Sequence, residues 1–195
     1  METEKSFDKD TLLEALNKLG ELAFSKKRTI EIAIYGGSAL MLTFDWRVST
    51  KDVDAVYEKD KSIINDLSKI VSEEFSLPED WLNDGVKGFL SRADMKDEAK
   101  VFLGDFPSED RPGIKVFLAS PPYLFAMKCM ALRFDNEENS DINDIIMLAK
   151  ELNIETADMA FEVVEKYYPT DRLPARNQFG IQELFDNLEK PMKLK

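Results

Sequence analysis

Hydrophobic and polar residues alternate with two different spacings along this chain, and the pattern changes near residue 120. Apolar residues three or four positions apart indicate a helix with one buried face, and strict alternation indicates a half-buried strand. Both patterns occur in the first part of the chain. Only the helical spacing continues after Pro121, a residue type that is common in first helical turns.

These patterns predict a definite order of elements. The expected helices cover residues 8–26, 38–44 and 61–75, a stretch that begins at Pro78, and four later stretches that begin at Pro121, Ser140, Thr156 and near residue 176. The expected strands cover residues 29–35, 52–57, 100–103 and 113–120. We therefore expect an α+β fold, with strands and helices mixed in residues 1–120 and a C-terminal helical bundle in residues 121–195 packed on it.

Composition limits the chemistry that such a fold can perform. The chain has 195 residues, no histidine and one cysteine, Cys129, which excludes histidine-based triads, histidine zinc sites and an internal disulfide. The lone cysteine and a mixed-charge N-terminus favour a cytoplasmic protein. No apolar run approaches the ~20 residues of a membrane span. The net charge of −12 and the lack of a long basic run give no strong nucleic-acid signal and favour small substrates or a protein partner.

Two aspartates stand two positions apart in the second expected strand. Residues i and i+2 of a strand project to the same face, so Asp52 and Asp54 should lie side by side while Val53 and Ala55 face the core. Two carboxylates about 5 Å apart repel by roughly 3 kcal/mol at an effective dielectric near 20. A hard divalent cation such as Mg²⁺ would relieve that repulsion. Alone, the pattern favours two aspartates that simply face water on a half-exposed strand.

The first expected strand ends in Gly36 and Gly37, and Ser38 is expected to open the next helix. Such a turn directs unpaired backbone N–H groups and the positive end of the helix to one point, where a phosphate can bind. Glycine lets the phosphate approach the backbone closely. A tight turn from strand to helix also needs glycine for its own geometry, so the glycines alone do not establish a phosphate site.

Together, the glycine turn and the aspartate pair are much more specific. A Gly-Gly-Ser turn, a short helix and then D-V-D-A on the next strand resembles the signature of the DNA polymerase β-like nucleotidyltransferase superfamily. Residues 30–150 are similar to the bacterial nucleotidyltransferase-like proteins related to the abortive-infection, type IV toxin group. In this chain the residues that carry the likeness are Arg47, Thr50, Asp52, Asp54, Leu124, Lys128, Ala131, Arg133 and Asp141-Ile142.

The resemblance implies a nucleotidyltransferase-like fold, in which helices flank a mixed β-sheet, and it implies a specific site. It implies that Gly36, Gly37 and Ser38 contact the triphosphate of a nucleoside triphosphate, and that Asp52 and Asp54 bind two Mg²⁺ ions and are catalytic. The implied product is a hydroxyl acceptor that carries a nucleoside monophosphate. The acceptor could be RNA, a protein or a small molecule, and the protein could be the toxin of a toxin–antitoxin pair with an antitoxin as partner.

Two cations are candidates for contacts with the nucleotide. Arg47 precedes the aspartates, where it could meet a phosphate or simply face solvent. Lys128 is the only charge in L-F-A-M-K-C-M-A-L, so it must either reach a cleft or pair with an acid, Asp141 or Asp144. Asp144 itself is expected on a solvated helix face. For Trp81, the core is the better prediction.

A third carboxylate, usual in active members of the superfamily, has no obvious position in this chain. The expected strand at residues 113–120 carries Lys115 and no acid, which leaves Asp105 and Asp84 as substitutes. Two functions of different class follow. One is a Mg²⁺-dependent nucleotidyltransferase, and the other is a non-catalytic protein of the same fold that binds a nucleotide or a partner.

Overall fold

The computed structural model of this chain describes residues 6–57, 59–92, 97–132 and 140–189. It divides into two compact units, the first formed by residues 1–88 and 100–119 and the second by residues 89–99 and 120–195. The division into domains at residues 1–120 and 121–195 stays a prediction.

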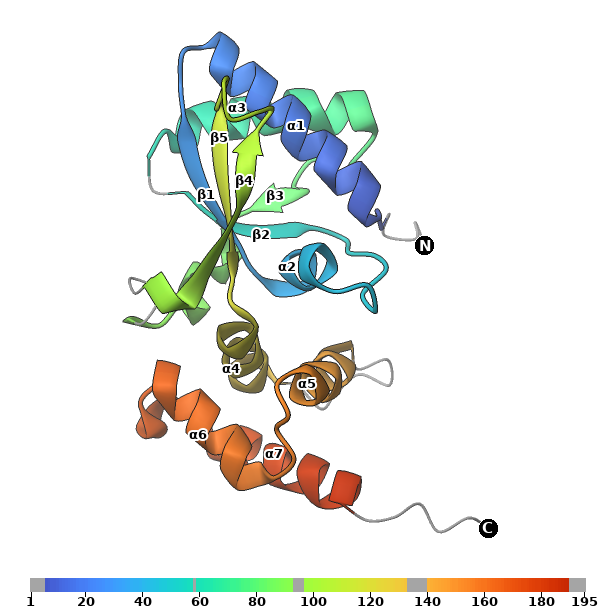
Figure 1. The fold of residues 1–195 in the computed structure, drawn as a ribbon, viewed down its shortest axis with the longest axis vertical. Coiled ribbons are helices and arrows are strands. Elements are labelled where there is room, and N and C mark those ends of the chain that lie inside the picture. The colour runs from blue at the N-terminus through green and yellow to red at the C-terminus, as the bar shows by residue number, and fades with distance from the viewer. Residues whose placement is uncertain (1–5, 58, 93–96, 133–139, 190–195) are drawn as a thin grey trace. The chain divides into compact units, whose positions relative to one another are not determined.

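The first unit is built on a sheet whose five described strands follow the order β3-β2-β1-β5-β4 (Figure 1). The strands are β1 (Ile30–Ile34), β2 (Val53–Val56), β3 (Leu82–Asn83), β4 (Lys100–Phe106) and β5 (Ile114–Ala119). β1 is parallel to β5 and antiparallel to β2, while β2 is parallel to β3 and β4 is antiparallel to β5. The sheet is therefore mixed, as expected from the sequence.

Three helices accompany this sheet: α1 (Lys9–Ser25), α2 (Gly36–Thr43) and α3 (Lys61–Phe75). Helix α1 packs on α3 and on strands β4 and β5, and helix α2 contacts β2. Their apolar faces supply fully buried residues such as Leu16, Leu40 and Leu67. α1 also crosses the β4–β5 connection very closely, because a Cβ built on Gly20 would stand 2.3 Å from the carbonyl oxygen of Phe106.

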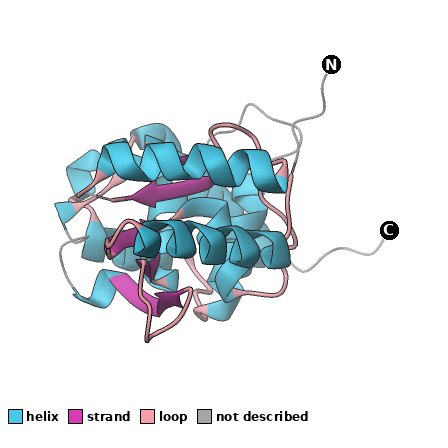
Figure 2. Ribbon diagram, turned by 90° about the horizontal axis from the view of Figure 1, so that it is seen from above, coloured by secondary structure: helices cyan, strands magenta, loops and turns pink. Residues whose placement is uncertain are grey.

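The described part of the second unit is mostly helical. Its helices are α4 (Pro121–Ala131), α5 (Ser140–Glu151), α6 (Ala157–Tyr167) and α7 (Ala175–Glu189). Figure 2 shows how large a part of the described chain is helical. Tyr123 of α4 stacks on Tyr167 with ring centroids 5.0 Å apart, and its hydroxyl accepts a hydrogen bond of 3.0 Å from the backbone N–H of Ser91.

The end of α4 is satisfied by a side chain from α7. The last carbonyls of a helix have no partner within the helix. The amide Nδ2 of Asn177, a buried residue, donates hydrogen bonds of 2.9 Å to the carbonyl oxygens of both Cys129 and Met130. This contact ties α7 to α4 and explains why a polar residue occupies the interior of the unit.

Most expected elements are confirmed, and the helix expected from Pro78 is wrong. The structure has the short strand β3 there, followed by a 3₁₀ helix at Gly85–Phe89. Two glycines weaken an α-helix in this stretch. Trp81, confirmed as a core residue, is fully buried, and its indole N–H donates to the carbonyl of Ser68 over 3.0 Å.

Two strand limits also differ from the prediction. The expected strand at residues 100–103 continues to Phe106, because its pairing with β5 runs to the Phe106–Ile114 register pair. The expected strand at residues 52–57 begins only at Val53, so Asp52 directly precedes β2. Within the described ranges, no helix has the length and apolar character that crossing a membrane requires.

Candidate active site

The two glycines after β1 form the first turn of α2, which corrects the expectation that Ser38 begins this helix. β1 ends at Ile34, Tyr35 is extended, and α2 starts at Gly36 with a φ of +61°. A side chain in that left-handed region is strained. A Cβ on Gly36 would also stand 2.7 Å from Oδ2 of Asp54. Glycine is therefore required here for its conformation and for the close approach of a carboxylate.

The pairing of β1 with β2 brings Asp54 to the helix start. Ile34 pairs with Ala55, and the backbone N–H of Tyr35 donates to the carbonyl of Asp54 over 2.8 Å. Val53 and Ala55 are buried, whereas Asp54 is half-buried on the other face of the strand. The start of a helix carries partial positive charge and N–H groups without intrahelical partners. The structure thus joins the predicted glycine turn and one predicted aspartate in a single place.

Asp52 is exposed at the beginning of the same strand. Its Oδ2 accepts a hydrogen bond of 3.2 Å from Nδ2 of Asn83, which lies on β3 in register with Asp54. Asn83 was not among the predicted site residues. The only signal for it in the sequence is the amide beside Trp81 in W-L-N-D, and a two-residue strand gives no alternation that could place that amide.

Arg47 and Thr50 lie over the second glycine. A Cβ on Gly37 would stand 3.0 Å from Nη2 of Arg47 and 3.2 Å from Oγ1 of Thr50. The Nε of Arg47 donates to the carbonyl of Ser49 over 3.1 Å, and the hydroxyl of Thr50 donates to the carbonyl of Asp52 over 3.0 Å. The connection between α2 and β2 therefore folds back and brings a guanidinium group to the glycine turn.

Ser38 points inward in the structure. Its side chain is 1% exposed, and its hydroxyl donates to the carbonyl of Tyr35 over 3.0 Å. This bond holds the strand end against the helix start. The hydroxyl contact with a phosphate expected for Ser38 stays a prediction, and its backbone N–H belongs to the same helix start.

The described residues contain no cluster of three or more Asp, Glu, Cys or His side chains suited to a metal ion. Neither suggested substitute for the third carboxylate completes one. Asp105 lies on β4, which β1 and β5 separate from β2. The carboxylate of Asp84 instead binds Lys61 at 2.5 Å and Lys87 at 2.8 Å. The acidic donors on the described part of this site are therefore Asp52 and Asp54.

These two carboxylates are donors of the kind that a magnesium ion takes. Mg²⁺ in nucleotide sites is usually held by one or two carboxylates together with substrate phosphates and water. Both aspartates offer hard oxygen donors, and the missing side chain of Gly36 leaves room beside Asp54, where a Cβ would lie at 2.7 Å from Oδ2.

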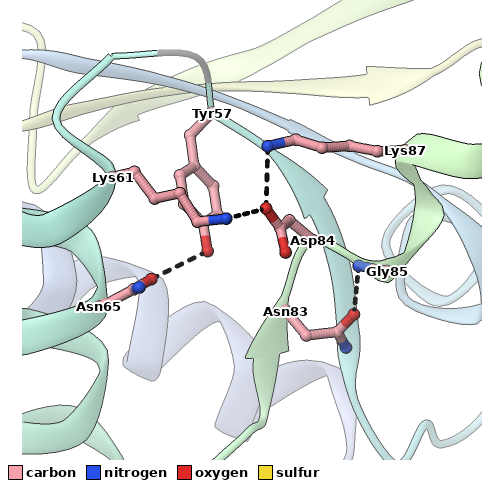
Figure 3. A network of polar contacts seen from close by, with 7 residues as sticks. All are labelled: Tyr57, Lys61, Asn65, Asn83, Asp84, Gly85 and Lys87. Carbon is pink, nitrogen blue, oxygen red and sulfur yellow. Dashed lines mark hydrogen bonds and ion pairs between the residues drawn. The ribbon is translucent and has the colours of Figure 1, made fainter.

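The contacts of Asp84 form a polar network between the segment that follows β3 and the start of α3 (Figure 3). Hydrogen bonds from Lys61 and Lys87 lower the pKa of the Asp84 carboxyl to about 2. The ammonium of Lys87 also lies 5.9 Å from the ring centroid of Tyr57. Burial raises the pKa of Tyr57, whose hydroxyl donates to Oδ1 of Asn65 over 3.3 Å. This network fixes the segment that follows β3 against the start of α3.

Lys128 belongs to the second unit and pairs with both candidate acids. Its Nζ lies 2.7 Å from Oδ1 of Asp141 and 2.9 Å from Oδ2 of Asp144, and its side chain is 14% exposed. Burial lowers the pKa of Lys128, but the attraction of the two carboxylates outweighs burial and the pKa is raised. The structure shows the ion-pair alternative. A nucleotide contact by Lys128 stays a prediction, and Arg133 lies outside the described residues.

The expectation that Asp144 faces solvent is wrong, because Asp144 is 1% exposed. The helical spacing correctly placed Asp141 and Asp144 on one face of α5. It could not show that this face turns toward α4, whose only charged side chain attracts both acids.

Comparisons with known proteins show which family the chain belongs to. No curated protein matches the chain. Among solved structures, the chain is similar to an antigenic nucleotidyltransferase-like protein from Paracoccidioides brasiliensis, with 19% identity, a TM-score of 0.46, and coverage of 83% of this chain and 89% of that one. Residues 10–181 match the family described as nucleotidyltransferase of unknown function, DUF6036. The chain belongs to this family of nucleotidyltransferases.

Proposed function

We propose that this protein is a Mg²⁺-dependent nucleotidyltransferase that moves a nucleoside monophosphate from a nucleoside triphosphate to a hydroxyl acceptor. The observation that carries the proposal is the approach of Asp54 to the glycine turn, where a Cβ on Gly36 would stand 2.7 Å from Oδ2. A phosphate-binding helix start and a cation-binding carboxylate must adjoin for this reaction, and this contact supports that arrangement.

The start of α2 and Arg47 would bind the triphosphate. The N–H groups of the first turn, at Gly36, Gly37 and Ser38, carry the positive end of the helix dipole. The Nη2 of Arg47 stands 3.0 Å from the Cβ position of Gly37, so a phosphate bound at the turn would also meet a guanidinium group. Arginine suits this role because its fork of donors matches phosphate oxygens.

Asp52 and Asp54 would hold the metal. Bound Mg²⁺ supplies Lewis-acid stabilisation of the charge that develops on the phosphoryl oxygens. In the transfer, the acceptor oxygen forms a bond to the α-phosphorus, the bond between the α-phosphorus and the bridging oxygen breaks, and pyrophosphate leaves. The hydroxyl proton passes to solvent at the exposed edge where Asp52 lies.

For the acceptor we propose a chemical class, and for the biological setting a general role. A net charge of −12 favours a protein or small-molecule acceptor over a long nucleic acid, which basic side chains would have to neutralise. We further propose the role of a toxin held in check by a partner protein. The support is the resemblance in Arg47, Thr50, Asp52, Asp54 and Lys128.

One observation favours the second function, a non-catalytic nucleotide-binding protein. No third acid joins Asp52 and Asp54 in the described part of the chain. Nucleotide binding alone needs only the helix start, Arg47 and one cation. The two functions differ in whether a nucleoside monophosphate is transferred to an acceptor.

The experiment uses labelled nucleoside triphosphates, Mg²⁺ and cell extract. Wild type is compared with Asp54→Asn and with Asp66→Asn, a matched change at an exposed aspartate of α3. We expect label on an acceptor with wild type and Asp66→Asn. The loss with Asp54→Asn should be about 100-fold or more, because metal stabilisation of the transition state is worth several kcal/mol.

A different pattern would decide for the alternative. If Mg²⁺ and nucleotide together raise the melting temperature of wild type but no label moves, the protein binds without transfer. Equal transfer by wild type and Asp54→Asn would refute the assigned site.

A further inference from the structure

We propose that Asn83 is a positioning residue for Asp52, and that this site pairs its two carboxylates with a neutral amide rather than with a third acid. The inference deepens the proposed function and rests on it for the role of Asp52 in metal binding. The contact that carries it is the hydrogen bond of 3.2 Å from Nδ2 of Asn83 to Oδ2 of Asp52.

The pairing of β2 with β3 gives Asn83 its place. The strands are parallel, with Val53 in register with Leu82 and Asp54 in register with Asn83. The backbone N–H of Val53 also donates to the carbonyl of Trp81 over 2.6 Å. Because Trp81 is fully buried, β3 is anchored beside the aspartates through the core.

The backbone around Asn83 also determines which way its amide faces. Its Oδ1 accepts a hydrogen bond of 2.9 Å from the backbone N–H of Gly85. A backbone N–H can bind only the oxygen of the amide, so the Nδ2 donor must face the other way, toward Asp52. The same side chain therefore holds the turn at Gly85 with one end and the carboxylate with the other (Figure 3 shows the Gly85 contact).

The neighbouring residue stabilises this turn. Asp84 binds Lys61 of α3 at 2.5 Å and Lys87 of the 3₁₀ helix at 2.8 Å. These ion pairs hold the chain on both sides of Gly85, so the amide is supported by a fixed backbone. Precise support behind a ligand is what orients it toward a metal.

The amide changes the electrostatics of the site. A carboxylate at residue 83 would add a third negative charge beside Asp52 and Asp54, and repulsion would favour splaying of the three groups. The amide instead donates to Asp52 and leaves the second oxygen of that carboxylate available to a cation. The site then depends on two carboxylates and on the phosphates of the nucleotide.

The test measures binding of Mn²⁺, a spectroscopic stand-in for Mg²⁺, in the presence of a non-hydrolysable nucleoside triphosphate analogue. The variants are Asn83→Ala, Asn83→Asp and the control Asn65→Ala, which removes an exposed asparagine of α3 whose amide oxygen accepts from Tyr57. We expect Asn83→Ala to weaken Mn²⁺ binding about 10-fold, as loss of a supporting contact does. Asn65→Ala should bind like wild type. Asn83→Asp should not restore the wild-type affinity, because an ionised carboxylate cannot donate a hydrogen bond to Asp52 and repels it.

The inference is overturned if Asn83→Ala binds Mn²⁺ as wild type does. A second measurement keeps it testable if wild type binds no Mn²⁺ and the proposed function itself fails. The side-chain amide signals of Asn83, assigned by their loss in Asn83→Asp, should shift in the NMR spectrum of Asp52→Ala and stay unchanged in Asp66→Asn. Amide signals that do not respond to Asp52→Ala would refute the contact whatever the protein binds.

Discussion

Two pairs of aspartates meet opposite surroundings in this molecule. Asp141 and Asp144 of the second unit converge on the largely buried ammonium of Lys128, at 2.7 and 2.9 Å. Asp52 and Asp54 of the first unit lie at the surface, where one meets an amide and the other approaches the start of a helix. Burial and a resident cation make the first pair a structural ion cluster. Accessibility and a positive helix end make the second pair suited to a ligand.

The largest effect should come from removing the cation of the buried cluster. Lys128→Met leaves two carboxylates together, one of them buried, and we expect a loss of about 3–5 kcal/mol in the free energy of unfolding. Urea denaturation measures this loss. The control Lys150→Met changes an exposed lysine of α5 and should stay within about 0.5 kcal/mol. If Lys128→Met were as stable as this control, the Lys128 cluster would not be the stabilising ion cluster that distinguishes it from Asp52 and Asp54.

The pH dependence of the same cluster follows from its raised lysine pKa. A raised folded-state pKa means that the stabilisation is complete below the ordinary lysine pKa. It is lost only as the pH rises through the higher folded-state value. Between pH 7 and 10, the stability difference between wild type and Lys128→Met should therefore stay constant.

The next effect concerns the helix start beside Asp54. Gly36→Ala places a Cβ at a φ of +61° and 2.7 Å from Oδ2 of Asp54. We expect the free energy of unfolding to fall by about 2 kcal/mol, since the left-handed conformation alone disfavours alanine by about 1–2 kcal/mol. Nucleotide-dependent stabilisation should fall as well, because the carboxylate must move. Gly88→Ala is the matched control, because a Cβ there meets nothing within 4 Å. Equal effects of the two changes would contradict the special role of Gly36.

The smallest effect on stability should come from a change at Asp84. This carboxylate pairs with two lysines, whereas Lys128 is a lysine that pairs with two carboxylates. The pKa of Asp84 is about 2. A lowered folded-state pKa means that the stabilisation is present above pH 4 and lost as the pH falls toward 2. Because the group is partly exposed, solvent screening limits this to about 1 kcal/mol. The free energy of unfolding of Asp84→Asn should be lower than that of wild type by this amount at neutral pH. Between pH 4 and pH 2 the variant should lose less stability than wild type does.

Much of the fold was predictable because its elements follow from local patterns. The amphipathic spacing of residues 61–75 predicted the limits of α3, and alternation predicted β1 and β5 to within a residue. β3 was not predictable. A two-residue strand has no periodicity, and it forms because Trp81 is buried and the backbone of Leu82 and Asn83 pairs with β2.

The candidate site was predictable in part for the same reason. Gly36 and Asp54 could be identified because each belongs to a motif with a local meaning. Asn83 could not, because its role depends on a neighbour 31 residues away in the chain. The helical pattern around Lys128 showed that the lysine needed a partner. Only tertiary structure could select both Asp141 and Asp144 and bury the second of them.

Anomalous diffraction from crystals grown with Mn²⁺ and a non-hydrolysable nucleoside triphosphate analogue would locate the metal and the triphosphate directly. We expect Mn²⁺ to be coordinated by carboxylate oxygens of Asp52 and Asp54, with the triphosphate on the backbone N–H groups of Gly36 and Gly37. Mn²⁺ bound instead at Asp141 and Asp144, or a triphosphate located away from the start of α2, would contradict this expectation.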